Sequence, residues 1–226
     1  MATSDASIRP TRAILWDLDG VIVDSGPYHY ESFRRLFADR GHELTEQRFF
    51  GELFGLRNEV IFRTMMRPLS PQETAALARE KEETYRELVA GNVEALPGAR
   101  EIIGRAREAG LLQAIVSSTP KANVDLIIGS LGLADAFDAI VAEEDAARGR
   151  PEPEGFLVAA SRLGVAPNAC VVIEDAPEGI TAGNASGART IGVATTRPAE
   201  RLVHADLVVA TLEDERVWRF VAGAGP

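Results

Sequence analysis

Three short segments carry side chains whose types and spacing could do chemistry. In the first, Asp17-Leu18-Asp19-Gly20, two carboxylates stand two positions apart, directly after the apolar run Ala13–Trp16. Such a pair suits a nucleophile and an acid/base partner, provided that a nearby cation offsets the repulsion between them. An isolated Asp-x-Asp-Gly is also typical of an Asx turn after a strand, so this segment alone leaves a structural role open.

The second segment is another acidic pair, Glu174-Asp175, which follows the apolar run Cys170–Ile173. Crowding several carboxylates at one edge of a fold is costly unless a metal ion or a proton compensates their charge. Hard oxygen ligands beside an anionic substrate suit Mg²⁺. The alternative is that the pair only caps the helix expected after it.

The third segment is Ser117-Ser118-Thr119, which follows the apolar run Leu111–Val116 and precedes Pro120 and a predicted helix. Hydroxyl and backbone N–H groups at the start of a helix favour the binding of phosphate. Taken alone, such a segment is more often an N-cap than a phosphate site.

Apolar runs recur along the chain, and each is followed by a stretch with the length and pattern of a helix. This alternation predicts a parallel sheet covered on both faces, which is a doubly wound α/β core. Ligands of such sheets bind at the carboxyl ends of the strands, so we expect Asp17, Ser117 and Asp175 to lie together. The predicted strands are Ala13–Trp16, Leu111–Val116, Ala139–Ala142, Cys170–Ile173, Thr190–Val193 and Leu207–Val209.

One interval breaks the alternation, because residues 25–96 contain no convincing strand. Helical periodicity or strong helix formers occupy Tyr28–Arg40, Arg57–Met66 and Pro71–Gly91. Pro97-Gly98 marks the return to the sheet. We therefore predict a core domain of residues 1–24 and 97–226, and an inserted helical cap domain of residues 25–96.

Composition narrows the class of protein. With 46% hydrophobic and 26% charged residues the chain can fill a sizeable core. A net charge of −10 and no basic stripe argue against binding to nucleic acid. No apolar run is long enough for a membrane helix, the N-terminus lacks the pattern of a signal peptide, and the single Cys170 fits a reducing compartment. We expect a cytoplasmic protein, monomeric or homodimeric, without membrane or nucleic-acid partners.

Together the three segments resemble the motifs of the haloacid dehalogenase-like hydrolase superfamily, in its branch with a helical cap inserted after the first core strand. The resemblance runs from about Ala13 to Val209 and implies a Rossmann-like core. It implies that Asp17 is a nucleophile that forms an aspartyl-phosphate, and that Asp19 protonates the leaving oxygen and then activates water. It further implies phosphate binding by Ser117 with Ser118, and Mg²⁺ binding by Asp17, the Asp19 carbonyl, Asp175 and Glu174.

One motif departs from the usual family pattern, because Gly149-Arg150-Pro151 carries arginine where lysine is common. Arginine keeps the positive charge and grips phosphate in a fork, although it is bulkier than lysine. Of the 24 basic residues only Lys81 and Lys121 are lysine, so the exchange fits the composition of the chain. We expect Arg150 to contact the phosphate and the nucleophile, and neighbouring Arg148 to be the surface residue.

Substrate choice is expected in the cap. His29 matches a histidine of the sugar-phosphate members of the superfamily, and a satisfied interfacial histidine is the alternative. The segment Phe54-Gly55-Leu56-Arg57-Asn58 resembles the specificity loop of the cap. In beta-phosphoglucomutases this loop carries a lysine and an arginine that hold a second phosphate; here Phe54 and Asn58 stand nearest to those positions, with Arg57 displaced by one.

The sequence thus predicts a Mg²⁺-dependent phosphatase that hydrolyses a small phosphorylated metabolite, of the sugar phosphate or phosphoglycolate class, through an aspartyl-phosphate. Two alternatives stay open. One is a sugar phosphomutase of the beta-phosphoglucomutase type, and the other is a non-catalytic member that binds a metabolite or a protein partner.

Overall fold

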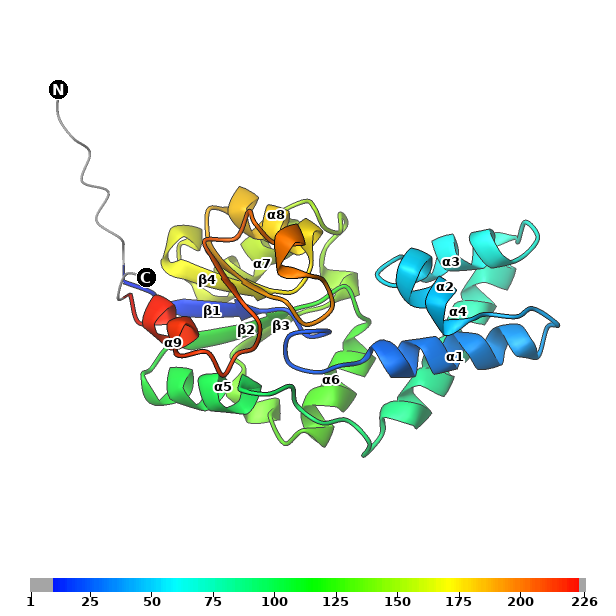
Figure 1. Ribbon diagram of the computed structural model, residues 1–226, viewed down its shortest axis with the longest axis horizontal. Coiled ribbons are helices and arrows are strands. Elements are labelled where there is room, and N and C mark those ends of the chain that lie inside the picture. Colours follow the sequence, from blue (N-terminus) through cyan, green and yellow to red (C-terminus); the bar gives the residue numbers. More distant parts are fainter. Residues whose placement is uncertain (1–9, 224–226) are drawn as a thin grey trace, which may run out of the picture. The chain divides into compact units, whose positions relative to one another are not determined.

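The computed structural model describes residues 10–223, which divide into two compact units (Figure 1). The core unit comprises residues 10–24 and 94–223, and the cap unit is Ser25–Val93. The N-terminal residues on which the absence of a signal peptide was predicted, 1–9, lie outside the described part of the chain.

The core unit is built on a sheet of six parallel strands in the order β3-β2-β1-β4-β5-β6, which confirms the doubly wound α/β fold. In the centre of the sheet, Leu15 of β1 pairs with Ala114 of β2 on one side and with Val172 of β4 on the other. The strands are β1 (Ala13–Trp16), β2 (Leu112–Val116), β3 (Ala139–Val141), β4 (Cys170–Glu174), β5 (Arg189–Val193) and β6 (Leu207–Val209).

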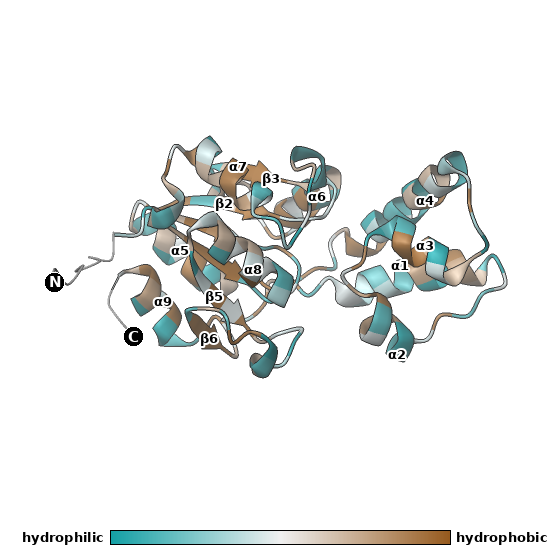
Figure 2. Cartoon of the chain, turned by 90° about the horizontal axis from the view of Figure 1, so that it is seen from above, coloured by the Kyte–Doolittle hydropathy of each residue, from teal (hydrophilic) through white to brown (hydrophobic). Residues whose placement is uncertain are grey.

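Helices cover both faces of the sheet, so its central strands are buried on both sides. Figure 1 shows α7 (Glu154–Leu163) and α8 (Pro177–Ser186) on one face, with α5 (Ala99–Glu108) and α6 (Lys121–Ser130) on the other. The last helix, α9 (Glu215–Val221), packs against β6. In Figure 2 the strands are mostly brown, as continuous apolar runs require, whereas the helices mix polar and apolar residues.

Helices joined by loops make up the described residues of the cap unit, without a strand among them. Its helices are α1 (Gly26–Ala38), α2 (Glu46–Arg48), a π-helical turn (Phe49–Leu53), α3 (Asn58–Met65) and α4 (Pro71–Val89). A capping box starts α4: the Ser70 hydroxyl accepts from the Glu73 amide, and the Glu73 carboxylate accepts from the Ser70 amide. The interior of the cap is rich in aromatic side chains, among them Phe33, Phe37, Phe49 and Phe62.

The structure confirms every predicted strand and the three predicted cap helices to within a few residues. Two differences bear on the site. Glu174 is the last residue of β4 and does not follow the strand, because it continues the ladder opposite Gly192 of β5. The segment Glu46–Leu53 is helical although no helix was expected there; Thr45 caps it by accepting from the Arg48 amide.

None of the helices in the described part of the chain combines the length and the apolar character needed to cross a lipid bilayer.

Candidate active site

Asp17 stands at the carboxyl end of the central strand. Its backbone N–H donates to the Ile173 carbonyl of β4 at 2.9 Å, which fixes the backbone, and its side chain is buried. Directly after it the chain turns sharply at Gly20, whose φ of 85° lies in the left-handed region. A Cβ at Gly20 would come within 2.3 Å of Asp175 Oδ2, so only glycine lets this turn approach the second acidic pair so closely.

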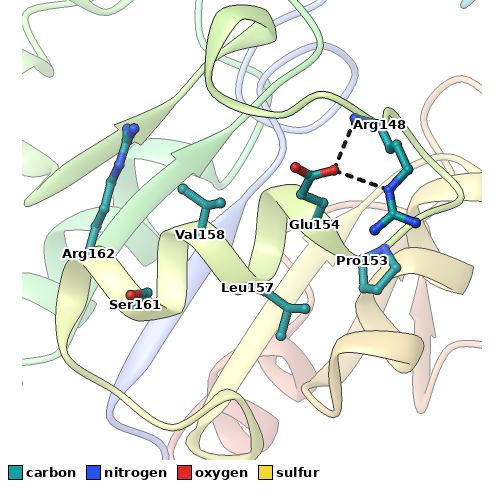
Figure 3. Close-up of a pocket in the computed structure, with 7 residues that line it drawn as sticks. All are labelled: Arg148, Pro153, Glu154, Leu157, Val158, Ser161 and Arg162. Carbon is teal, nitrogen blue, oxygen red and sulfur yellow. Dashed lines mark hydrogen bonds and ion pairs between the residues drawn. The ribbon is translucent and has the colours of Figure 1, made fainter.

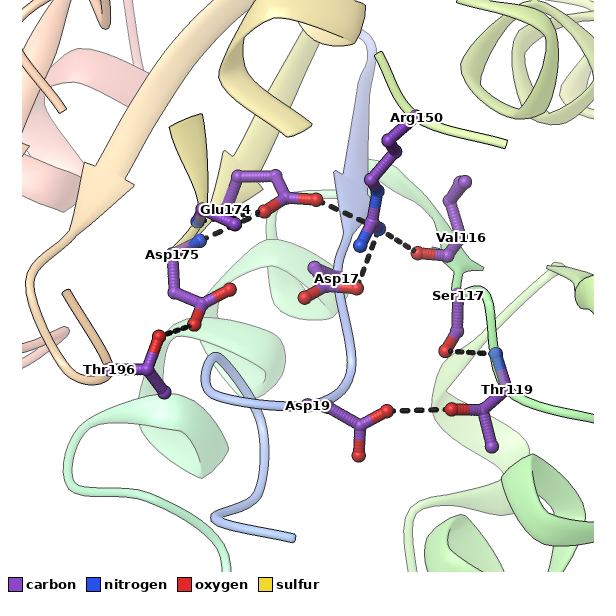
Figure 4. Close-up of polar contacts among 10 residues, drawn as sticks. Asp17, Asp19, Val116, Ser117, Thr119, Arg150, Glu174, Asp175 and Thr196 are labelled. Atoms are coloured by element: carbon purple, nitrogen blue, oxygen red, sulfur yellow. Dashed lines mark hydrogen bonds and ion pairs between the residues drawn. The ribbon is translucent and has the colours of Figure 1, made fainter. Parts of the chain in front are cut away.

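Arg150 binds the carboxylates of both acidic segments. Its Nη2 lies 2.6 Å from Asp17 Oδ1, 2.8 Å from Glu174 Oε1 and 2.9 Å from the Val116 carbonyl (Figure 4). Burial acts to lower the pKa of this guanidinium, but Asp17 and Glu174 outweigh that effect and the pKa is raised. All three contacts use one nitrogen, so this arginine meets Asp17 and Glu174 much as a lysine ammonium would.

Arg148 lies elsewhere, in agreement with its expected place at the surface. Its backbone N–H and its Nε both donate to Glu154 Oε2, at 3.0 and 3.4 Å, at one end of a surface hollow along α7 (Figure 3). None of the residues predicted for the site lies in that hollow. Its lining residues are Arg148, Pro153, Glu154, Leu157, Val158, Ser161 and Arg162.

Glu174 and Asp175 bring two more carboxylates to the same edge of the sheet. Glu174 is fully buried, and its Oε2 accepts from the backbone N–H groups of Asp175 at 3.0 Å and Ala176 at 3.2 Å. Asp175 Oδ2 accepts from the Thr196 hydroxyl. The side chain of Ala176, the N-cap of α8, cannot cap the helix, and the amides that Glu174 binds precede the first helical residue, Pro177.

Burial raises the pKa values of both groups. The Glu174 carboxyl is shifted well above its usual range, although Arg150 opposes the shift. Burial, together with the nearby charge of Asp17, raises the pKa of Asp175 to about 7. Raised carboxyl pKa values at a buried edge are the signature of negative charge that the surrounding protein compensates only in part.

The residues present fit a divalent cation. Asp17, Glu174 and Asp175 each offer a carboxylate oxygen within 4.8 Å of the others. Three ionised carboxylates against the single charge of Arg150 would leave two negative charges. Mg²⁺ prefers oxygen ligands, and a buried group of carboxylates with surplus negative charge provides them.

The serine segment lies at the same edge but is no helix cap. Ser117 directly follows β2, is buried, and its Oγ accepts from the Thr119 N–H at 3.1 Å. Helix α6 begins only at Lys121, its N-cap is Pro120, and the Lys121 amide is bound by Glu144. The segment therefore precedes Pro120 and the helix as expected, whereas the alternative that it caps the helix is wrong, because Pro120 is the N-cap and Glu144 binds the first helical amide. Ser118 is exposed.

Asp19 lies opposite the serine segment. Its Oδ2 accepts a hydrogen bond of 2.7 Å from the Thr119 hydroxyl (Figure 4). Sequence reasoning passed over both Thr119 and Thr196 as site residues. Thr119 could have been found from its place in the serine segment, whereas nothing in the sequence around Thr196 points to Asp175, which is reached only through the fold.

Within the cap, two of the three predicted residues belong to one polar network. His29 Nδ1 accepts from Lys81 Nζ at 2.8 Å, and the ring stacks on Tyr85 with centroids 4.2 Å apart. Burial, and then the charge of Lys81, lower the pKa of His29 well below its usual value. Lys81 Nζ also donates to Glu82 Oε1, which accepts from Asn58 Nδ2 at 2.9 Å.

Arg57 differs from the other two, because it is exposed at the N-cap of α3. Lys81 and Glu82 were not predicted as part of this network. The signal for Lys81 was its spacing: it lies four residues after Leu77 and four before Tyr85, on the buried stripe of α4.

A Rossmann-like sheet that gathers carboxylates at its carboxyl edge, with a helical unit inserted after the first strand, defines a capped α/β enzyme. The family model described as haloacid dehalogenase-like hydrolase matches residues 14–193. The chain belongs to this family, and it is an enzyme, a hydrolase or a mutase.

Three relatives span nearly the whole chain. Hexitol phosphatase A of Escherichia coli (strain K12) is 34% identical over 92% of this chain and 94% of its own length. Beta-phosphoglucomutase of Bacillus subtilis (strain 168) is 30% identical, covering 90% and 91% of the two chains. Among solved structures, beta-phosphoglucomutase from Clostridium difficile superposes with a TM-score of 0.80 at 29% identity, over 92% of this chain and 96% of that one.

Proposed function

We propose that the protein is a Mg²⁺-dependent phosphatase of a small phosphorylated metabolite, of the sugar phosphate or phosphoglycolate class, with Asp17 as the nucleophile. The observation that carries the proposal is the position of Asp17: it is fixed at the end of β1, with one oxygen held 2.6 Å from Arg150 Nη2 and the acid/base candidate Asp19 two residues away. A buried carboxylate so placed can attack phosphorus without reorganisation of the site.

In the first half of the reaction, an Asp17 oxygen attacks the phosphorus atom. The bond between phosphorus and the ester oxygen breaks, and Asp19 gives its proton to the leaving alcohol. The product is an aspartyl-phosphate on Asp17. In the second half, Asp19 takes a proton from water and the water oxygen attacks phosphorus. The bond between phosphorus and the Asp17 oxygen breaks, which releases inorganic phosphate and restores the Asp17 carboxylate.

Charge neutralisation falls to Arg150 and to the hydroxyl of Ser117. Asp17, the Asp19 carbonyl and Asp175, with Glu174 beside them, would hold Mg²⁺. When bound, Mg²⁺ supplies electrostatic stabilisation of the transferring phosphoryl group. Arg150 keeps the nucleophile oriented through its contact with Oδ1. Because the chain carries a net charge of −10, local cations rather than long-range attraction must draw the substrate in.

Relatives support the reaction and the substrate class. Besides the hexitol phosphatase, a fructose-1-phosphate phosphatase of Escherichia coli (strain K12) is 31% identical over 80% of this chain. Both names describe hydrolysis of a phosphate ester of a small polyol or sugar. The same site would act on a small molecule without a nucleic-acid or membrane partner, and we propose a cytoplasmic monomer or homodimer.

Phosphomutase activity is the second candidate, because beta-phosphoglucomutases are among the relatives. A mutase must hold two phosphates, whereas a phosphatase needs to hold only one. Asn58 carries no charge and already donates its amide to Glu82, and Phe54 offers no donor, so the specificity loop favours hydrolysis. The remaining alternative, a non-catalytic binding protein, fits neither the enzyme family nor the intact set of Asp17, Asp19 and Asp175.

The test is phosphate release from a panel of hexitol phosphates, sugar phosphates, phosphoglycolate and nucleotides, with and without Mg²⁺. Asp17→Asn should lower turnover more than about 10³-fold, because no other group replaces the nucleophile. Asp135→Asn, at an exposed aspartate of the core, is the matched control and should keep wild-type activity.

Conversion of beta-glucose 1-phosphate to glucose 6-phosphate in the presence of a bisphosphate primer, without phosphate release, would instead identify a mutase. Substantial release of phosphate by purified Asp17→Asn would overturn the assignment of the nucleophile.

A further inference from the structure

The backbone of Thr119 is held by hydrogen bonds at both its N–H and its carbonyl. Its backbone N–H donates to Ser117 Oγ at 3.1 Å, and its carbonyl accepts from the Glu143 N–H at 3.1 Å. The side chain is buried, and a β-branched residue has few rotamers to choose from. The hydroxyl is thereby aimed at Asp19 Oδ2, 2.7 Å away.

A hydrogen bond to one oxygen of a carboxylate restricts the rotation of the whole group. For an acid/base residue this restriction matters, because proton transfer requires the carboxylate to point at the ester oxygen and later at the water. Asp19 lies on the turn after β1, whereas Thr119 follows β2, so the bond also joins two neighbouring strand ends (Figure 4).

Thr196 makes a corresponding bond on the other side of the site. Its hydroxyl donates to Asp175 Oδ2, and the hydroxyl of its neighbour Thr195 donates to the Gly20 carbonyl. The Thr195 N–H bonds to the Val193 carbonyl at 2.9 Å, which ties this loop to the end of β5. The loop therefore holds both Asp175 and the turn that follows Asp17.

We propose that these threonines are positioning residues with separate tasks, Thr119 for the acid/base group Asp19 and Thr196 for the metal ligand Asp175. The proposal rests on the proposed function of the site. Each half stands on its own hydrogen bond, and each predicts a different defect. Loss of the Thr119 hydroxyl impairs proton transfer to the leaving group, whereas loss of the Thr196 hydroxyl impairs metal binding.

The test compares Thr119→Val, Thr119→Ser, Thr196→Val and Thr196→Ser in the full chain. Release of the leaving group in a single turnover, which reports formation of the aspartyl-phosphate alone, is measured with two substrates. The alkoxide of an alkyl phosphate needs a proton to leave, whereas the phenolate of a nitrophenyl phosphate leaves without one. Mg²⁺ affinity is measured separately by calorimetry without substrate. Thr181→Val, on the exposed side of α8, is the matched control.

For Thr119→Val we expect the single-turnover rate of alcohol release from the alkyl phosphate to fall about 10- to 100-fold. The single-turnover release of nitrophenolate should change less than about threefold, and Mg²⁺ affinity should stay at the wild-type value. Thr119→Ser, which keeps the hydroxyl, should restore most of the loss. An equal fall on both substrates that serine does not restore would show a merely structural role and overturn this half.

For Thr196→Val we expect Mg²⁺ affinity to fall about 10- to 100-fold, as happens when a group that orients a metal ligand is removed. The ratio of the two turnover rates should remain that of the wild type, and Thr196→Ser should recover the affinity. Unchanged Mg²⁺ affinity in Thr196→Val would overturn this half.

Failure of the proposed function gives a different result from failure of this inference. A wild-type chain that releases no phosphate from either ester overturns the phosphatase and the task of Thr119 together. An active wild type whose substrate ratio is the same in Thr119→Val overturns the positioning role alone.

Discussion

The core unit buries three carboxylates, Asp17, Glu174 and Asp175, against the one guanidinium of Arg150, whereas the cap unit buries Lys81 beside Glu82 and the neutral ring of His29. The two clusters are similar in size but differ in charge balance. The cap cluster carries one positive and one negative charge, and its polar groups form hydrogen bonds and an ion pair with one another.

This difference separates a structural cluster from a chemical one. In the cap, the ammonium of Lys81 also lies over the rings of Phe33 and Tyr85, 5.0 and 4.9 Å from their centroids, so packing and charge agree. In the core, burial first and then the neighbouring negative charges raise the pKa values of Glu174 and Asp175, and the surplus of negative charge favours binding of a cation. Four experiments, taken from the largest expected effect to the smallest, test the contrast.

The first breaks the balanced cluster. Lys81→Met should lower the free energy of unfolding by about 3–5 kcal/mol, because it leaves Glu82 without its buried partner. Lys121, the other lysine of the chain, is exposed and pairs with Asp125 on α6, so Lys121→Met should cost less than about 0.5 kcal/mol. Urea unfolding followed by circular dichroism measures both. Equal, small effects would mean that the cap cluster is not a buried structural pair.

The second experiment supplies the missing charge in the core. Mg²⁺ at a hundred times its dissociation constant should stabilise the wild type by about 2.7 kcal/mol. Asp175→Asn should lose this gain, yet in a chelator it should be at least as stable as the wild type, because it removes a like charge from the cluster. Both tryptophans, Trp16 and Trp218, lie in the core, so their fluorescence reports this unit. A chelated variant much less stable than the wild type would contradict the surplus of charge.

The third experiment follows the metal-free core with pH. The pKa of Asp175 is about 7 in the folded protein and near 3.8 when unfolded, so between these values the folded state binds more protons. Its contribution to stability is therefore complete below about pH 4 and is lost as the pH rises through about 7. Tryptophan fluorescence in urea should show this loss in the wild type. Asp175→Asn or added Mg²⁺ should flatten the profile, and an unchanged slope would refute the assignment.

The fourth experiment, with the smallest effect, looks for the opposite sign in the cap. The pKa of His29 is lowered in the folded state below its ordinary value of 6.5, so the unfolded state binds the extra proton. The cap should be fully stable above about pH 6.5 and lose stability as the pH falls below it. Hydrogen exchange of α1 and α4 measures this unit, and His29→Gln should remove the trend. After correction for the intrinsic effect of pH on exchange, slower exchange of these helices as the pH falls through 6 would contradict the predicted loss of stability.

Much of the core could be predicted because its signals are local. The strands are continuous apolar runs, and the rule that ligands meet the carboxyl ends of parallel strands suffices to bring Asp17, Ser117 and Asp175 to one edge. The role of Arg150 could also be predicted, because arginine keeps the positive charge that the usual lysine would place beside the nucleophile.

What escaped prediction depends on contacts between distant segments. Thr196 reaches Asp175 from the loop after β5, and Thr119 reaches Asp19 across 100 positions of sequence. The cap network depends on Lys81, on α4, meeting His29, on α1. Glu144, which binds the first amide of α6, likewise comes from another segment, and the sequence did not show that it leaves the serine segment no role as the N-cap.

The central claim is that Asp17 becomes covalently phosphorylated during turnover. It is tested most directly by quenching Asp19→Asn with acid during reaction with an aryl phosphate, since this variant should form the intermediate but break it down slowly. Peptide mass spectrometry should then find one phosphoryl group on the peptide that contains Asp17, removable by hydroxylamine. Phosphate released at a measurable rate with no phosphorylated peptide would contradict the account.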